Sequence, residues 1–206
     1  MNRPFIIFLS IITFIANANA QPDSVKAKKP LPLVIAMGTH TLSFPWYNKP
    51  LTYRFNPALM VGTEFTHKQT KHFRFYQPVG LGYFQHEFME SGVFINTDLG
   101  FSYLTGFGLH VDLLLGGGYL HAFSRRELFE VRNGEYEKVT DWGRPSAMFS
   151  LAAVLGYQFK SNRRFALSPF VQYRWFAQTP FAQELPALTH LFLSIGTRIY
   201  FKGDES

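Results

Sequence analysis

The chain contains no cysteine among its 206 residues, which excludes disulfides, thiolate metal sites and cysteine nucleophiles. Long apolar runs are also missing, because no window after residue 20 approaches the roughly 18 apolar residues of a transmembrane helix. A mature chain that spans a membrane must therefore be a closed β-barrel. The histidines show neither HxH nor HExxH spacing, so neither a metal site nor a cofactor is predicted.

The N-terminus has the form of a secretory signal peptide. One positive charge at Arg3 precedes a short apolar stretch at 5–15, and Ala18-Asn19-Ala20 ends the segment with an A-x-A cleavage pattern. The apolar stretch is too short for a membrane anchor. We therefore predict cleavage between Ala20 and Gln21. Residues 21–32 then form a periplasmic tail, and 33–202 form one barrel domain.

The charge balance is basic, with a formal net charge of +6 and a pI near 9.5. The lysines and arginines form no stripe, and an exported protein rarely meets nucleic acid, so we expect no nucleic-acid partner. An anionic lipid surface is the expected counterpart. Aromatic residues make up 17% of the chain although its mean hydropathy is only −0.03, so the large apolar side chains must be segregated by face.

The period of that segregation is two residues. Ile95, Leu99 and Phe101 alternate with Asn96 and Asp98, which is typical of a β-strand. The same alternation recurs along the chain between turn signals. It predicts an all-β protein of eight antiparallel strands, near 33–44, 56–66, 72–86, 92–103, 107–123, 145–159, 165–178 and 188–201.

Glycines indicate which face of these strands points inward. Gly117 is on the odd-numbered face, whereas ten others in the strand segments are on the even-numbered face: Gly38, Gly62, Gly80, Gly82, Gly100, Gly108, Gly116, Gly118, Gly156 and Gly196. The interior of an eight-stranded barrel is only wide enough for side chains, so small residues belong there. The even face is predicted to line the lumen, and the apolar odd face is predicted to contact lipid.

Aromatic residues crowd the strand ends on the odd face, as in an interfacial girdle, and short turns alternate with long loops. With the final Ile199-Tyr200-Phe201, these features resemble the OmpX- and OmpA-type small barrels over residues 33–201. The resemblance implies a monomer in the Gram-negative cell outer membrane that contacts membrane lipids and lipopolysaccharide. It also implies recognition of the terminal aromatic strand by the outer-membrane assembly machinery, although Phe201 is followed by five further residues.

Charged residues of both signs occupy the inward face. They can neutralise each other as a salt-bridged plug that holds strand register, or they can form a proton or solute path. The plug is favoured because eight strands leave no open channel. Asp112 also shares a face with His110, and these two can pair. The predicted lumen network comprises Glu64, Arg74, Asp98, Asp112, Arg174 and Arg198.

An enzyme of the lipid A deacylase kind is an alternative, because that barrel class uses a histidine, a serine and an acidic residue. The candidate catalytic residues are His121, Ser124 and Glu127. Their spacing opposes this reading, since His121 and Ser124 point to opposite faces of a regular strand. His121 as a polar residue at the membrane interface is the favoured interpretation.

The segment 124–145 is predicted to be a long charged hairpin whose tip is Asn133-Gly134. It is either a solubilising loop or a surface for a partner or lipopolysaccharide phosphates, with Arg125, Arg126 and Arg132 as candidate contacts. The leading hypothesis is a structural or surface-binding barrel of the outer membrane. A lipid A-modifying enzyme and a soluble periplasmic barrel carrier are the alternatives.

Overall fold

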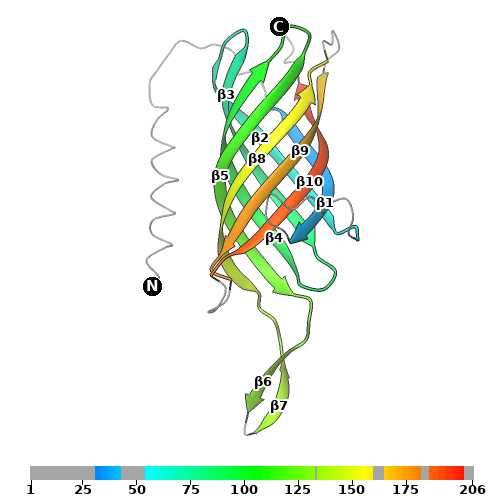
Figure 1. Ribbon diagram of the computed structural model, residues 1–206, viewed down its shortest axis with the longest axis vertical. Coiled ribbons are helices and arrows are strands. Elements are labelled where there is room, and N and C mark those ends of the chain that lie inside the picture. Colours follow the sequence, from blue (N-terminus) through cyan, green and yellow to red (C-terminus); the bar gives the residue numbers. More distant parts are fainter. Residues whose placement is uncertain (1–30, 43–53, 133, 160–164, 182–185, 202–206) are drawn as a thin grey trace.

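The computed structural model describes residues 31–42, 54–132, 134–159, 165–181 and 186–201. The predicted signal peptide and its cleavage site lie outside these ranges. Figure 1 shows a barrel of tilted strands from which a small hairpin projects. The strands are β1 (Leu33–Leu42), β2 (Pro57–Gln69), β3 (Phe73–Gln85), β4 (Glu90–Leu104), β5 (Leu109–Ser124), β6 (Leu128–Arg132), β7 (Glu135–Val139), β8 (Arg144–Tyr157), β9 (Phe165–Thr179) and β10 (Leu188–Phe201).

The barrel is closed and contains eight strands in the order β1-β10-β9-β8-β5-β4-β3-β2. All of its pairings are antiparallel, and β1 closes the barrel on β10, with Val34 opposite Arg198. β6 and β7 pair only with each other in the described chain. The predicted eight-stranded antiparallel barrel is confirmed. The end of the barrel where β1 starts and β10 stops is called the turn end. The end from which the β6–β7 hairpin projects is called the loop end (Figure 1).

The two faces of the strands are assigned as the glycines predicted. In β4, Ile95 and Leu99 are half-exposed on the outside, whereas Asn96 and Asp98 are buried inside. The inward glycines make room for their neighbours. A Cβ atom on Gly82 would lie 2.1 Å from the Phe94 ring. The small residues thus allow large lumen side chains in a narrow barrel.

Gln77 is an exception to the alternation. It is on the outward face yet is only 9% exposed, and its Nε2 donates a hydrogen bond to Thr97 Oγ1 at 3.0 Å. His67 Nε2 lies 3.2 Å from Gln77 Oε1. The neighbouring Pro78 has no N–H to give to the β3–β4 ladder, whose pairing is interrupted at this point. The polar side chain is thus partnered locally rather than facing hydrocarbon alone.

The outer surface of the barrel is apolar around its circumference. Large hydrophobic side chains remain exposed on every barrel strand, including Met37, Leu59, Leu81, Leu99, Leu115, Leu151, Val171 and Ile195. An apolar band this extensive is expected in lipid, where a closed barrel leaves no unpaired edge. The described residues contain no helix that is long and apolar enough to cross a membrane. The architecture is that of a small outer-membrane barrel.

Candidate functional site

The lumen side chains are sorted into alternating polar and apolar layers along the barrel axis. β9 shows the order, from Ser168 at the turn end through Phe170, Arg174 and Phe176 to Gln178 at the loop end. Each of these five side chains is buried. Any solute that crosses the barrel would have to pass through both kinds of layer.

The polar layer nearest the turn end contains two acidic residues and two arginines. Arg198 Nε donates to Glu64 Oε1 at 2.6 Å, and Arg198 Nη2 donates to Asp112 Oδ2 at 2.6 Å. Arg74 Nη2 donates to the other Glu64 oxygen at 2.9 Å, and the Tyr76 hydroxyl donates to Asp112 at 2.9 Å. Both carboxylates are therefore bound by guanidinium groups, which offsets the cost of burying them.

A second polar group occupies the middle of the lumen. Arg174 Nη2 donates to Asp98 Oδ2 at 2.8 Å, and the Ser150 hydroxyl donates to Asp98 Oδ1 at 2.6 Å. An apolar cluster that includes Leu114 and Phe170 lies between this group and the turn-end layer. The six charged residues of the predicted lumen network therefore form two separate groups, one of four residues and one of two.

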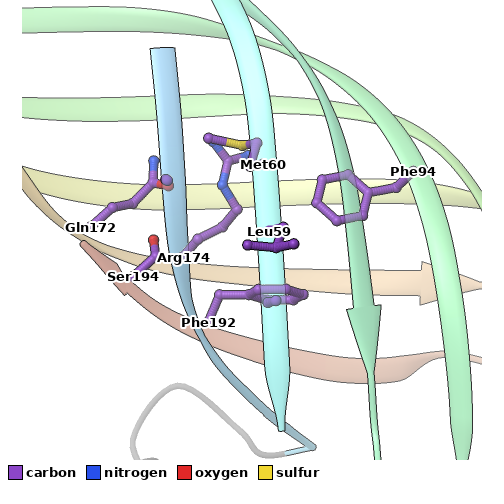
Figure 2. Close-up of a pocket in the computed structure, with 9 residues that line it drawn as sticks. Leu59, Met60, Phe94, Gln172, Arg174, Phe192 and Ser194 are labelled. Atoms are coloured by element: carbon purple, nitrogen blue, oxygen red, sulfur yellow. The ribbon is translucent and has the colours of Figure 1, made fainter. Parts of the chain in front are cut away.

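Two small cavities adjoin Arg174, each of about 20 Å³. Figure 2 shows the first, between the rings of Phe94 and Phe192 and the side chain of Arg174. The second is lined by Asn96, whose Oδ1 has no hydrogen-bond partner in the described part of the chain, and the same is true of Arg174 Nε. A space of this size between polar groups is large enough for one water molecule and too small for a substrate.

A larger apolar layer separates the middle of the lumen from the loop end. Every barrel strand except β1 contributes to this buried cluster. Its aromatic rings contact one another across the lumen, with ring centroids 6.3 Å apart for Phe84 and Phe176 and 6.0 Å apart for Phe94 and Phe192. Side chains packed this closely leave no open channel through the layer, which opposes a solute path.

The polar layer at the loop end contains residues that were not among the site residues predicted from the sequence. His40 Nε2 and His190 Nδ1 are 2.9 Å apart, so one ring donates and the other accepts. His190 Nε2 lies 3.0 Å from Gln178 Oε1, and Gln178 Nε2 donates to Ser146 Oγ at 3.1 Å. Because Ser146 bonds an amide and not an imidazole, this chain does not activate a serine.

Glu90 closes the same layer on the opposite wall. Its Oε2 accepts a hydrogen bond from Arg144 Nη2 at 3.0 Å, and its Oε1 is 3.8 Å from His190 Nε2. The sequence could have indicated the residues of this layer, because even-numbered strand positions face the lumen. His40, Glu90, Ser146, Gln178 and His190 all have even numbers and belong to loop-end halves of strands.

The structure does not bring the three candidate catalytic residues together. His121 bonds the Tyr119 hydroxyl at 2.8 Å and the Trp142 carbonyl at 3.0 Å. The Ser124 hydroxyl donates to the Arg126 carbonyl, and Glu127 forms an exposed ion pair with Lys138. Among the described residues His121 therefore has neither a serine nor a carboxylate as a partner, and this set has no geometry for nucleophilic activation.

The β6–β7 hairpin projects from the loop end, away from the barrel (Figure 1). Gly134 has a φ of +85°, as the predicted hairpin tip requires, whereas Asn133 lies outside the described residues. Phe129 is 54% exposed and Tyr136 is 79% exposed. Phe129 is opposite Lys138 in the register, so both share a face with Tyr136.

Three arginines were the candidate surface contacts. Arg125 and Arg126 are exposed where β5 leaves the barrel toward the hairpin. The side chain of Arg132 lies outside the described part of the structure. Trp142, 85% exposed, is on the returning segment, next in sequence to Asp141, whose side chain accepts a hydrogen bond from the Ser124 backbone N–H. The base of the hairpin thus combines cationic and aromatic side chains.

No family model and no curated protein sequence matches the chain. Solved structures with a similar fold include Neisserial surface protein A (TM-score 0.47, 13% identity, 83% of this chain and 96% of that chain) and the outer membrane enzyme PagL (TM-score 0.45, 11% identity, 80% and 97%). Another is Ail, the attachment invasion locus protein of Yersinia pestis (TM-score 0.39, 15% identity, 82% and 97%). At these identities and TM-scores the similarity assigns no activity to this chain.

Proposed function

We propose that this protein is a binding protein of the cell outer membrane, anchored by its barrel, which presents the β6–β7 hairpin to a macromolecular partner. The observation that carries the proposal is the exposed aromatic face of a hairpin that stands clear of the barrel (Figure 1). Exposed aromatic side chains are over-represented in binding surfaces, where they bury a large apolar area.

The two faces of the hairpin differ in chemistry. Alternation along β7 puts Tyr136 and Lys138 on one face and Glu135 and Glu137 on the other. Phe129 adds a second aromatic ring to the Tyr136 face. A loop that served only to keep the barrel soluble would not need to segregate its aromatic side chains, so the Tyr136 face is the proposed contact surface.

The arginines at the base of the hairpin support a role for lipid in the same function. Arg125 and Arg126 are exposed next to the barrel rim, which is where lipid headgroups would surround a barrel in a membrane. Guanidinium groups bind phosphate oxygens well, so lipopolysaccharide phosphates are the proposed ligands of this rim. Such contacts would hold the barrel and the base of the hairpin in the outer leaflet.

Location and topology are tested by an epitope tag inserted after Gly134. An exposed tip tolerates an insertion, so the tagged protein is expected in the membrane fraction after carbonate extraction. Antibody or protease is expected to reach the tag on intact cells. Release by carbonate would favour the soluble carrier instead. A tag protected until the outer membrane is opened would place the hairpin on the periplasmic side.

Binding is tested with a photo-crosslinking amino acid placed at single hairpin positions in living cells. Position 136 is expected to give a discrete adduct with a partner macromolecule. Position 135 is the matched control, because the two side chains are adjacent, exposed and on opposite faces. Equal labelling at both positions, or none at 136, would contradict the proposed contact face.

A further inference from the structure

Two irregularities of the barrel wall meet on its outer surface near the turn end. β2 contains a bulge at His67, which has no partner in the ladder with β3. On the other edge of β3, the pairing with β4 is interrupted at Gln77 and Pro78. A bulge changes the direction in which side chains point, and bulges are over-represented next to functional sites. The outer wall at this place therefore merits a chemical interpretation.

The bulge turns a lysine to the outer face. Thr66 is opposite Tyr76, which is buried in the lumen, whereas Lys68 is opposite Phe75, which is 40% exposed on the outside. Residues that oppose each other in a ladder share a face of the sheet. In a regular strand Lys68 would face inward with the other even-numbered residues. The bulge instead puts it on the outer face next to His67, whose ring centroid is 5.7 Å from that of Phe75.

Gln77 fixes the orientation of the His67 ring. The Gln77 Nε2 group donates to Thr97 Oγ1 at 3.0 Å, so Gln77 Oε1 is the atom that faces His67 Nε2, at 3.2 Å. An amide oxygen only accepts, so His67 carries a proton on Nε2, and in the neutral imidazole Nδ1 has a lone pair. In the described part of the chain this Nδ1 has no hydrogen-bond partner, and the His67 side chain is exposed. The lone pair is thus available to an external N–H or O–H donor.

Lys68 supplies a cation beside that acceptor. Its side chain is exposed, and no carboxylate of the described residues pairs with it. Phe65 and Phe75, 41% and 40% exposed, are the outward neighbours on β2 and β3. Aromatic side chains near a strand end are typical of the depth at which lipid headgroups meet hydrocarbon. The site therefore combines a cation, a hydrogen-bond acceptor and an apolar surface at headgroup depth.

We propose that this site binds a phospholipid whose headgroup contains a primary ammonium, in the leaflet at the turn end. The lipid phosphate accepts a hydrogen bond from the Lys68 ammonium, and the headgroup ammonium donates one to His67 Nδ1. The acyl chains lie along Phe65 and Phe75. Gln77 is a positioning residue, because it holds the imidazole with Nδ1 directed away from the barrel wall. The inference requires the barrel to lie in lipid, as its apolar outer surface indicates, and does not depend on the hairpin.

The test compares two lipids on the purified, folded full-length barrel in detergent. Phosphatidylethanolamine and phosphatidylcholine with identical acyl chains share the phosphate, but the choline group has no N–H to donate. Native mass spectrometry at a series of lipid concentrations gives the affinity for the first lipid bound. The parent is expected to bind phosphatidylethanolamine about five- to tenfold more tightly, as one hydrogen bond from a charged donor would provide. Equal affinities would overturn the proposal.

Three substitutions separate the contributions of the site. His67→Leu and Gln77→Leu put apolar side chains on the lipid-facing wall, and both are expected to abolish the preference while leaving phosphatidylcholine binding unchanged. Lys68→Gln is expected to weaken both lipids about five- to tenfold, because both contain the phosphate. A preference that survived in His67→Leu would contradict the assigned acceptor. The mobility of unheated samples on gels confirms that each variant is folded.

Two controls distinguish the site from general attraction and from the headgroup alone. Lys71→Gln removes the same charge from the turn between β2 and β3, outside the bulge, and is expected to change neither affinity. An effect as large as that of Lys68→Gln would mean that any nearby cation suffices, and the site would fail. Glycerophosphoethanolamine has the same headgroup without acyl chains and is expected to displace the lipid only weakly. Displacement at the concentration at which the lipid itself binds would rule out a membrane lipid as the ligand.

Discussion

Substitution of Arg198 by methionine is expected to destabilise the barrel by about 3–5 kcal/mol, the usual effect of removing one partner from a buried ion pair. Arg198 is 3% exposed and donates to Glu64 and Asp112, which lie on β2 and β5. Methionine fills most of the volume but leaves Asp112 without a cation. Glu64 keeps the hydrogen bond that it accepts from Arg74.

The quantity to measure for Arg198→Met is the urea concentration at which half of the protein is unfolded. The folded fraction is monitored by the mobility of unheated samples on gels. Arg54→Met is the matched control. Arg54 pairs with Glu87, but both side chains are well exposed, so the loss should not exceed about 1 kcal/mol. If both variants unfolded at the same urea concentration, the lumen network would have no special role in stability.

The sequence was sufficient for most of the fold because one strong constraint acts along the whole barrel. Each strand separates lumen from outer surface, so a period of two persists through every strand. Glycine identified the inner face, because close strand contacts in a narrow barrel exclude a Cβ atom. At Gly116, for example, a Cβ would lie 2.2 Å from the Thr97 carbonyl oxygen.

Partners within the lumen could not be predicted in the same way. Parity places Glu64, Asp112 and Arg198 inside, but their pairing depends on the stagger of β2, β5 and β10, which alternation does not encode. Parity also placed His40 and His190 inside, although their hydrogen bond joins positions 150 residues apart. The hydrogen bond between His110 on β5 and Ser168 on β9 depends in the same way on the stagger of strands, because β8 lies between these two.

Gln77 is a position at which the alternation itself gives the wrong environment. Its odd number predicted contact with lipid, but the side chain is nearly buried between His67 and Thr97. The cause is local, because Pro78 interrupts the pairing of β3 with β4. A pattern rule based on regular pleating therefore fails where one residue cannot donate to the ladder.

Leu99→Arg is the second substitution for which a large effect is expected. Leu99 is 53% exposed on the outer face, near the middle of β4, and is flanked on that face by Thr97 and Phe101. An arginine at the midplane of a transmembrane barrel costs about 2–4 kcal/mol, because its charge must leave water for hydrocarbon. The substitution should lower the yield of folded barrel in lipid vesicles and shift its unfolding midpoint accordingly.

Phe107→Arg is the control that separates depth from chemistry. Phe107 is 65% exposed, but it lies in the turn between β4 and β5, at the edge of the apolar band. The same arginine there reaches water and headgroups, so the expected cost is about 0–1 kcal/mol. The unfolding midpoints of both variants are to be measured in lipid vesicles and in a water-soluble detergent, which surrounds the barrel with a thinner layer of hydrocarbon. A larger effect of Leu99→Arg in vesicles requires hydrocarbon around β4. Equal and small effects at both positions would mean that the odd-numbered face is not surrounded by lipid. That result would contradict the proposed location in the membrane.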